Sequence, residues 1–461
     1  MTVTSQVPFV RIIVLTFDGG DMTLRCLQSL ERLDWPADRV EIVLVDNGSL
    51  DDVAERVKRD FPSVTVLEPL ANLGFAGGCN LGIMHGVRGS IADQIDHVAL
   101  INNDATVDSG WLRALVAEMD ADPRVAAVAS KMLFADRYAP LSIEILDELE
   151  GGRRDELGVC ITSLRVDGVR CDERFQFDEG FHGAVDPDRA RDEEFARWSR
   201  RSAALRLVDP GEGAHRVSLR LNAKRPLRVR LSSDVEAVEL VVGEGGETRY
   251  TDVEVGVGSA RIDVINNVGS ELYRFGFAGD RGFMEPDVGQ YDEPAEVFAW
   301  CGGATLLRAR HLDEVGLFDE RLFLYYEDTD LAWRARLHGW HHVYAPSALV
   351  RHHHAQSSGV GSEVFRFHTE RNRLLVTARN APLKVLTLAL AAEIRHCVRV
   401  HLALLVKRPL MLKMPSRAEP RHRRKVLGAI IMGLPAALRH RWSQPAGDRR
   451  AVHRRWERDK W

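Results

Sequence analysis

Cysteine is scarce in this sequence, and the few cysteines present are not arranged in pairs. The six are Cys26, Cys79, Cys160, Cys171, Cys301 and Cys397, and no two of them are spaced as in a CxxC motif. A structural zinc site or a disulfide framework would need closer and more regular spacing. The spacing therefore predicts free thiols in a reducing compartment.

Long uninterrupted apolar runs are also missing. The longest candidate, Leu383–Leu405, is interrupted by Lys384, Glu393, Arg395 and Arg399, so it does not read as a membrane-spanning helix. The first residues, Met1–Pro8, lack the basic-then-apolar pattern of a secretion signal. Both observations predict a cytoplasmic protein.

The sequence has no strong charge of either sign. The formal net charge of -5 over 461 residues gives no reason to expect nucleic-acid binding by the whole protein. The C-terminal part is the exception, because residues 407–461 hold sixteen Lys and Arg against four Asp and Glu. This local excess of positive charge needs an explanation of its own.

The first part of the chain alternates apolar, β-branched runs with helical patterns. Strands are predicted at Val10–Leu15, Glu41–Val45, Val64–Leu67 and His97–Ile101, with helical spacing of leucines after the first. Such alternation is typical of an α/β fold with a mostly parallel sheet. Ligands of these folds bind beside the carboxyl ends of the strands.

The pattern changes near residue 144. Residues 146–200 are rich in charge and are predicted to form loops or short helices, whereas residues 215–262 alternate in the manner of an antiparallel β-sandwich. The α/β pattern resumes at Asp263–Asn267. We therefore predict four parts, which are residues 1–143, an inserted β module at 144–262, a second α/β half at 263–382 and a helical tail at 383–461.

The tail is predicted to be helical and basic. Leu383–Val406 reads as a long amphipathic helix, and Val426–Leu438 as a short apolar helix with basic clusters on both sides. Such helices are attracted to anionic membrane surfaces. The alternative is an ordinary helical tail with solvated charges.

Polar residues follow several of the predicted strands. Asp46 ends the second, where a carboxylate can accept hydrogen bonds from a base or ribose, although it can also cap the next helix. Asn102-Asn103-Asp104 ends the fourth, and Asp104 can supply one oxygen to a divalent cation that bridges a diphosphate. The loop from Asn72 to Gly82 is rich in Gly and Asn, which suits either close approach of a ligand or simple turns.

An acidic segment, Tyr325-Tyr326-Glu327-Asp328-Thr329-Asp330, lies downstream in aromatic surroundings. A carboxylate in an apolar setting can acquire the raised pKa that suits a general base. Acids also complement the dipole of a helix N-terminus. We assign the chemistry to Asp328 and the helix start to Asp330.

Three successive histidines, His352-His353-His354, come later. In a strand, His352 and His354 share a face and His353 opposes them. An imidazole can ligate a metal or contact a diphosphate, and a polar loop is the alternative interpretation.

Taken in order, these motifs resemble the family 2 glycosyltransferases, in particular their rhamnosyltransferase-like and galactofuranosyltransferase-like members. The resemblance covers about residues 9–140 and 263–380. The series that carries it comprises Thr16-Phe17-Asp18, Val45-Asp46-Asn47-Gly48-Ser49, the loop from Asn72 to Gly82, Asn102-Asn103-Asp104, Gly302-Gly303, Phe318-Asp319-Glu320, Glu327-Asp328-x-Asp330, His352 and Ser357.

The resemblance implies a GT-A fold and a role for each matching residue. Donor-binding residues would be Thr16, Phe17, Asp18, Asp46, Asn72, Gly74, Asn80 and Asn103. Asp328 would be the catalytic base and Glu327 its neighbour in the acceptor site, which Trp300, Gly302 and Gly303 would border. Asp104 and His352 would bind Mg2+ or Mn2+, although Asn102 replaces the first acid of the family's DxD motif.

The implied activity is an inverting sugar transfer from a nucleotide-diphosphate donor. The first expectation for the donor is dTDP-rhamnose, followed by UDP-galactofuranose or another UDP-sugar. The acceptor would be a glycan or a polyprenyl-linked glycan in cell-envelope polysaccharide synthesis, at the inner face of the cell membrane. The alternatives are a non-catalytic nucleotide- or glycan-binding protein and a sugar nucleotidyltransferase. The inserted module could bind glycan, contact a partner, shape the acceptor channel or have no ligand.

Overall fold

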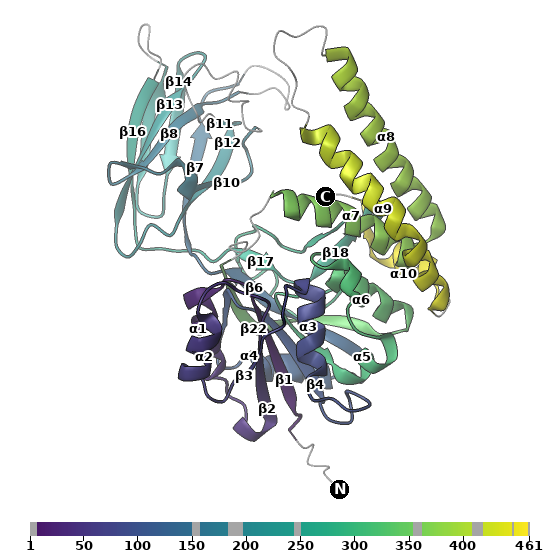
Figure 1. Cartoon of the computed structure of the whole chain (residues 1–461). Coiled ribbons are helices and arrows are strands. Elements are labelled where there is room, and N and C mark those ends of the chain that lie inside the picture. The colour runs from purple at the N-terminus through teal and green to yellow at the C-terminus, as the bar shows by residue number, and fades with distance from the viewer. Residues whose placement is uncertain are drawn as a thin grey trace. The chain divides into compact units, whose positions relative to one another are not determined.

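The computed structural model describes residues 7–149, 157–182, 197–243, 250–353, 362–407, 418–444 and 447–459. The chain forms two compact units, one made of residues 1–135 and 265–461 and the other of residues 136–264. Figure 1 shows the elements of both. The second unit begins and ends close to the insert boundaries predicted from the sequence.

The first unit is built on a twisted mixed sheet. Its strands lie in the order β20 (Ala295–Val297), β22 (His341–His352), β6 (Val125–Phe134), β21 (Ala304–Arg308), β4 (His97–Asn102), β1 (Val10–Thr16), β2 (Val40–Asp46) and β3 (Thr65–Leu67). The pairs of β1 with β2 and β4, of β2 with β3 and of β6 with β22 are parallel. Strand β21 runs antiparallel to both of its neighbours. Short strands β5 (Ala105–Val107) and β17 (Ile265–Asn267) pair with β22 and β6.

Helices cover both faces of this sheet because successive strand residues point to opposite sides. Ile13 faces α3 (Gly74–Met84), α5 (Ala309–Val315) and α6 (Glu327–Leu337). Ile12 and Val14 face α1 (Gly20–Leu30), α2 (Val53–Asp60) and α4 (Trp111–Asp120). The predicted α/β class with a mostly parallel sheet is confirmed, as the GT-A resemblance implies.

The register of the parallel strands brings their carboxyl ends to one edge. Thr16 of β1 pairs with Asp46 of β2, and Leu15 pairs with Asn102 of β4. Three of the polar clusters singled out in the sequence therefore meet at the same end of the sheet.

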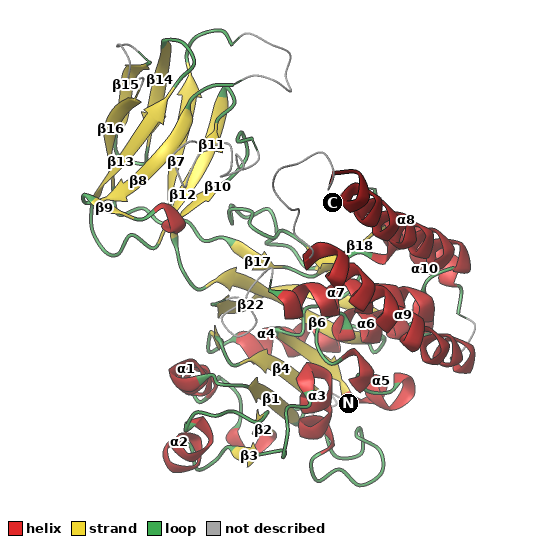
Figure 2. Ribbon diagram, turned by 45° about the horizontal axis from the view of Figure 1, so that its top comes forward, coloured by secondary structure: helices red, strands yellow, loops and turns green. Residues whose placement is uncertain are grey.

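The second unit is a β-sandwich (Figure 2). One sheet contains β10 (Phe175–Phe177), β12 (Ser202–Val208), β7 (Tyr138–Ile145), β14 (Leu227–Ser232) and β15 (Ala237–Val242). The other contains β11 (Arg197–Trp198), β8 (Cys160–Val166), β13 (His215–Asn222) and β16 (Tyr250–Val257), with β9 (Val169–Arg170) beside β8. Alternate residues of both sheets share one apolar core. The prediction of loops or short helices over residues 146–200 is wrong where the structure describes them, because β8 to β11 fall there.

The C-terminal helices are α7 (Glu363–Asn380), α8 (Leu383–Lys407), α9 (Ala418–Ser443) and α10 (Arg449–Trp456). Within the described residues, no helix is long and apolar enough to cross a membrane. Helices α7, α8 and α9 share buried apolar contacts through residues such as Leu374, Ala389 and Ile430.

The predicted separate tail is corrected by these contacts. Arg441 of α9 donates to the carbonyl oxygens of Ala378 and Ala381, at 3.1 and 2.6 Å. Trp456 of α10 is 9% exposed and belongs to the apolar core beneath the sheet. The short strand β23 (Glu457–Arg458) pairs with β18 (Ser270–Tyr273), which also pairs with β19 (Ala278–Asp280). Helices α9 and α10 are therefore an integral layer of the first unit.

Candidate functional site

The ends of β1 and β4 are joined by a hydroxyl and amide network. Asn103 Nδ2 donates to Thr16 Oγ1 and to Thr23 Oγ1, both at 3.2 Å. The two hydroxyls also lie 2.9 Å apart. Thr16 and Asn103, both predicted to bind the donor, thus lie together on adjacent strands.

The loops after β1 and β2 are tied to each other as well. The backbone N–H of Asp18 donates to Ser49 Oγ at 2.9 Å, and Asp18 Oδ1 accepts from the N–H of Leu50 at 2.6 Å. Asp46 is 6% exposed and accepts from the N–H of Ser49 at 3.0 Å. Phe17 is 41% exposed beside them. A nucleoside bound here would meet Thr16, Asp18 and Asp46 together.

The Gly- and Asn-rich segment Asn72–Gly82, predicted to be a loop, is helical from Gly74 onward because it forms most of α3. Asn80 Nδ2 donates to the carbonyl oxygen of Phe318 at 3.0 Å and to Glu320 Oε1 at 3.1 Å, while its Oδ1 accepts from the N–H of Phe318 at 3.1 Å. The protein thus supplies partners to both polar atoms of this amide, and Asn80 ties α3 to the loop at Phe318. Its donor-binding assignment stays a prediction.

Asn72 and Gly74 also have roles in the local structure. Asn72 Oδ1 accepts from Asn47 Nδ2 at 3.0 Å and from the N–H of Gly74 at 2.8 Å. Gly74 has a φ of +70°, and a Cβ there would collide with Phe323. Residue 74 is therefore glycine for backbone shape and close packing, and no donor contact is needed to explain it.

The acidic segment stands at the start of α6, after a strained loop. Phe323, Tyr325 and Tyr326 all have positive φ, between 64° and 70°, which non-glycine residues adopt only when the surroundings hold them. Asn372 of α7 holds this loop, because its Nδ2 lies within 2.8 to 2.9 Å of the carbonyl oxygens of Leu322, Leu324 and Tyr325.

Asp328 is half-buried at the beginning of α6. Its Oδ2 accepts from the N–H of Gly302 at 3.2 Å, and its Oδ1 accepts from the N–H of Thr329 at 2.5 Å. Burial raises the pKa of Asp328 above its usual range, although these hydrogen bonds act in the opposite direction. A carboxylate with a raised pKa and access to solvent has the properties of a general base.

The two neighbouring acids differ from Asp328. Glu327 is 5% exposed, and its Oε2 has no hydrogen-bond partner among the described residues. Burial, followed by the charge of Asp328, raises the pKa of Glu327 well above its usual range. Glu327 is therefore a buried acid behind Asp328, which corrects its placement on the acceptor surface.

Asp330 is fully buried and belongs to an ion-pair cluster. Its oxygens accept from Arg334 Nε at 2.9 Å and from Asn380 Nδ2 at 2.8 Å, and Asp330 Oδ1 forms an ion pair with Arg379 at 2.9 Å. Asp330 does stand in the first turn of α6, as predicted. The cluster shows that it also joins α6 to α7.

The Gly302-Gly303 turn lies between Asp328 and the end of β4. Gly302 donates to Asp328, as described, and the carbonyl oxygen of Gly303 accepts from the N–H of Asn102 at 2.8 Å. A Cβ at Gly302 would collide with the ring of Phe75. Glycine here brings Asp328 close to the strand end that carries Asp104.

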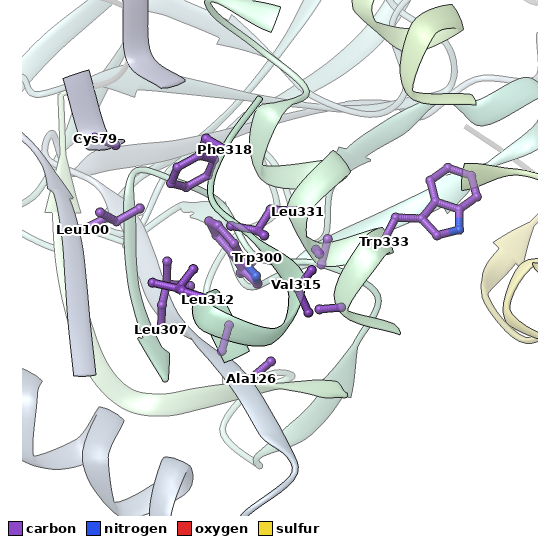
Figure 3. Close-up of a cluster of buried hydrophobic side chains, with 14 of the residues drawn as sticks. Cys79, Leu100, Ala126, Trp300, Leu307, Leu312, Val315, Phe318, Leu331 and Trp333 are labelled. Carbon is purple, nitrogen blue, oxygen red and sulfur yellow. The ribbon is translucent and has the colours of Figure 1, made fainter. Parts of the chain in front are cut away.

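Trp300 lies elsewhere than predicted. It is fully buried, packs against Phe318 at a ring-centroid distance of 6.1 Å, and belongs to the core that Figure 3 shows. Its assignment as a residue that borders the acceptor is therefore corrected. Its role is to pack beneath the Gly302 turn.

Asp104 and His352 come together from the ends of β4 and β22. Asp104 Oδ1 lies 3.0 Å from His352 Nε2, and Asn102 Nδ2 lies 3.3 Å from the same nitrogen. His352 Nδ1 lies 3.0 Å from Asn266 Oδ1. Burial raises the pKa of Asp104, but the hydrogen bond and charge of His352 outweigh burial and leave that pKa below its usual value.

This pair fits a divalent cation. A carboxylate oxygen and an imidazole nitrogen are both ligands that such a cation takes, and a bound cation would replace the hydrogen bond that joins Asp104 and His352 here. Among the described residues no group of three His, Cys, Asp or Glu side chains could hold a metal ion. Phosphate and water would therefore have to complete the ligand shell. Ser357 and His354 lie outside the described residues.

Sequence reasoning missed Asp280 and its supporting amide. Asp280 ends β19 and accepts from Asn267 Nδ2 at 2.5 Å. Burial of the carboxyl group raises the pKa of Asp280 to about 6, the hydrogen bond from Asn267 lowers it, and the nearby charge of Asp328 adds to the rise. The polar pair Asn266-Asn267 at the end of β17 was the available signal, since it ends a strand as the other site clusters do.

Residues 11–141 match the model of "Glycosyl transferase family 2", and residues 263–369 match that of "Glycosyltransferase like family 2". An N-acetylglucosaminyl-diphospho-decaprenol L-rhamnosyltransferase of Mycobacterium tuberculosis (strain H37Rv) is 49% identical over 69 residues. That match covers 14% of this chain and 22% of the relative, about a fifth of its length.

Solved structures were compared as well. A mannosyltransferase from Pyrobaculum calidifontis in complex with GDP-Man and Mn2+ is 14% identical, and the match covers 93% of this chain and 88% of that one, with a TM-score of 0.39. A GalNAc-T7 structure with UDP, GalNAc and Mn2+ is 12% identical, over 92% of this chain and 55% of that one, with a TM-score of 0.45. With TM-scores of 0.39 and 0.45, neither similarity carries an argument about the function of this chain.

The two family matches lie on either side of the inserted sandwich and together span just over half of the chain. They cover the strand ends, the Gly302-Gly303 turn, α6 and β22, which are the elements that form the site. The chain belongs to family 2 of the glycosyltransferases.

Proposed function

We propose that this chain is an inverting glycosyltransferase in which Asp328 removes the proton of the acceptor hydroxyl. The observation that carries the proposal is the position of Asp328, a half-buried carboxylate with a raised pKa beside the Gly302 turn. The acceptor oxygen attacks the anomeric carbon, the bond from that carbon to the diphosphate breaks, and the proton passes to Asp328. A single displacement needs one base and no covalent nucleophile.

The donor would lie along the carboxyl ends of β1, β2 and β4. Thr16, Asp18 and Asp46 would hold the nucleoside, with Asn103 beside them and Phe17 exposed next to them. Asp104 and His352 would hold Mg2+ or Mn2+ near the diphosphate. When bound, the cation would offset the negative charge that develops on the departing diphosphate.

The donor sugar and acceptor rest on the partial relative. Its name describes transfer of L-rhamnose to a diphospho-decaprenol that carries N-acetylglucosamine. We therefore propose dTDP-rhamnose as the first donor to test, and a polyprenyl-linked glycan of the cell envelope as the acceptor. UDP-galactofuranose and other UDP-sugars are the next donors.

A lipid-linked acceptor suits a protein that binds the inner membrane surface peripherally. The exposed face of α8 carries Leu388, Ile394, Val398 and Leu402 together with Lys384, Arg395 and Arg399. Its acid, Glu393, is buried and pairs with Arg373. Apolar and basic residues on one exposed face favour an anionic lipid surface.

A donor screen tests the proposal. The full chain is incubated with each nucleotide sugar, a polyprenyl-linked N-acetylglucosamine acceptor and Mg2+ or Mn2+, and release of the nucleoside diphosphate is measured. We expect release with one donor, and Asp104→Asn should raise the cation concentration needed for half-maximal rate by at least about tenfold. Asp108→Asn, an exposed acid nearby, is the matched control. Absence of release with every donor and either cation would contradict the proposal.

A further inference from the structure

A pocket of about 310 Å³ lies between η5 (Glu320–Leu322), α7 and α9, away from the residues of the proposed reaction. Its polar lining consists of Asp319, Arg321, Arg371 and Arg379, and its apolar lining of Leu322, Leu375, Ala429, Met432, Gly433, Ala436 and Ala437. Three guanidinium groups thus share one cavity with a single carboxylate and an apolar wall.

The charge in this pocket is not balanced by the described residues. Asp319 pairs with Arg321 at 2.6 Å and also with Arg379, whose second acid partner is Asp330. Asp330 is itself shared with Arg334. Two carboxylates therefore serve three arginines, Arg321, Arg334 and Arg379.

Arg371 makes its hydrogen bonds to neutral groups. Its Nη1 donates to the carbonyl oxygen of Arg321 at 3.1 Å and to Asn372 Oδ1 at 2.7 Å. The positive field extends to His440, whose pKa is lowered to about 3 by burial and by the charges of Arg379, Arg334 and Arg321. An anion in the pocket would meet a net positive charge.

The pocket opens beside an exposed face of α9 that carries apolar and basic residues. Ile431, Met432 and Trp442 are 62%, 79% and 76% exposed. Arg421, Arg424, Lys425, Pro435 and Arg439 are exposed at positions that fall on the same helical face. The one acid in α9, Glu419, pairs with Arg366 and Arg423. This face is complementary to an anionic lipid surface.

We propose that this pocket binds the phosphate of a membrane lipid, with Arg321 and Arg371 as phosphate ligands and the wall of α9 as the contact for the lipid chain. Guanidinium groups present several donors in a planar fork that matches phosphate oxygens. Met432, Ala429 and Ala436 supply an apolar path from the arginines to the exposed face. This deepens the membrane-surface part of the proposed function but does not depend on sugar transfer.

Vesicle sedimentation of the full chain tests the site. Phosphatidylcholine vesicles with a minor fraction of phosphatidylglycerol are compared with pure phosphatidylcholine. We expect Arg321→Gln with Arg371→Gln to weaken binding to the anionic vesicles about thirtyfold, because each basic contact to such a surface is worth about 1 kcal/mol. Arg59→Gln with Arg310→Gln removes the same charge from α2 and α5 and should bind as the unaltered chain does.

A second variant separates the pocket from general charge attraction. Ala436→Phe fills the cavity without a change of charge and should also weaken binding, as long as thermal unfolding shows an intact fold. The proposal would be overturned if Ala436→Phe bound the anionic vesicles as tightly as the unaltered chain does. It would also be overturned if the two double variants lost the same amount of vesicle binding. Inorganic phosphate is tested alone in the same way. If it protects the chain from unfolding as well as the anionic vesicles do, the ligand is a soluble anion and the lipid proposal is wrong. Sugar transfer is measured separately, so either proposal can fail alone.

Discussion

Asp328→Asn should reduce the rate of sugar transfer by about two to four orders of magnitude, the usual contribution of a general base. The amide keeps the size of the carboxylate, and its one oxygen can still accept from either Gly302 or Thr329, but it cannot take the acceptor proton. The measurement is the initial rate of nucleoside diphosphate release with the donor found in the screen. Donor affinity, measured by thermal shift, should change little because the donor residues lie on β1, β2 and β4.

The control for this variant is Glu327→Gln. Glu327 is buried, and burial raises its pKa well above the usual range, so an uncharged amide of similar shape should be tolerated there and most activity should remain. The pH profile provides a second control. A base acts when deprotonated, so the rate should fall as pH decreases through the pKa of Asp328. Burial raises that pKa, so the fall should begin at a higher pH than for an ordinary aspartate. An unchanged rate in Asp328→Asn would remove Asp328 from the mechanism.

Asp330→Ala, two residues further on, should destabilise the first unit by about 3–5 kcal/mol. The change leaves Arg334 and Arg379 without this carboxylate in a buried position, 3% exposed in each case. Buried charges that lose their partner carry an uncompensated desolvation cost. The measurement is urea unfolding followed by tryptophan fluorescence, which Trp333 in α6 makes sensitive to this region.

The matched comparison is Asp21→Ala, which breaks an exposed ion pair with Arg56. Exposed pairs are screened by water and salt, so the midpoint should move far less than in Asp330→Ala. If both variants unfold at the same urea concentration, Asp330 does not stabilise the fold. The division of roles, with Asp328 as the base and Asp330 as a structural residue, would then be wrong.

The parallel strands of the sheet, and the polar residues at their carboxyl ends, could be predicted from local sequence. Apolar β-branched runs fix β1, β2 and β4, and polar clusters end each of them, so their convergence follows from parallel pairing. In the inserted module, strict alternation revealed β13, β14 and β16. Strand β8 was missed because charge-rich neighbours obscured its apolar positions.

The details of the site depend on long-range contacts that a local pattern does not carry. Asn80 looks like a ligand in its Gly/Asn loop, but it is satisfied by Phe318, which lies more than two hundred residues later. Asp280 reaches the site through β19, after the inserted unit. Burial of Trp300 and Glu327 is likewise decided by the elements packed around them.

The C-terminal helices illustrate the same limit. Their basic composition predicted a tail on a membrane surface, and composition does not reveal which side of an amphipathic helix is buried. Trp456 and Arg441 face the protein, whereas Ile431 and Met432 face solvent. Removal of the chain after Pro382 would therefore disturb the core, and single substitutions on α9 are the better test of membrane binding.

The stereochemistry of the product is the most direct test of the proposed single displacement assisted by one carboxylate. A donor of known anomeric configuration is converted by the unaltered chain, and the product is examined by proton NMR before any equilibration. A single displacement predicts that the anomeric configuration of the product is opposite to that of the donor. A product that keeps the configuration of the donor would contradict it, because retention requires two displacements or a different mechanism.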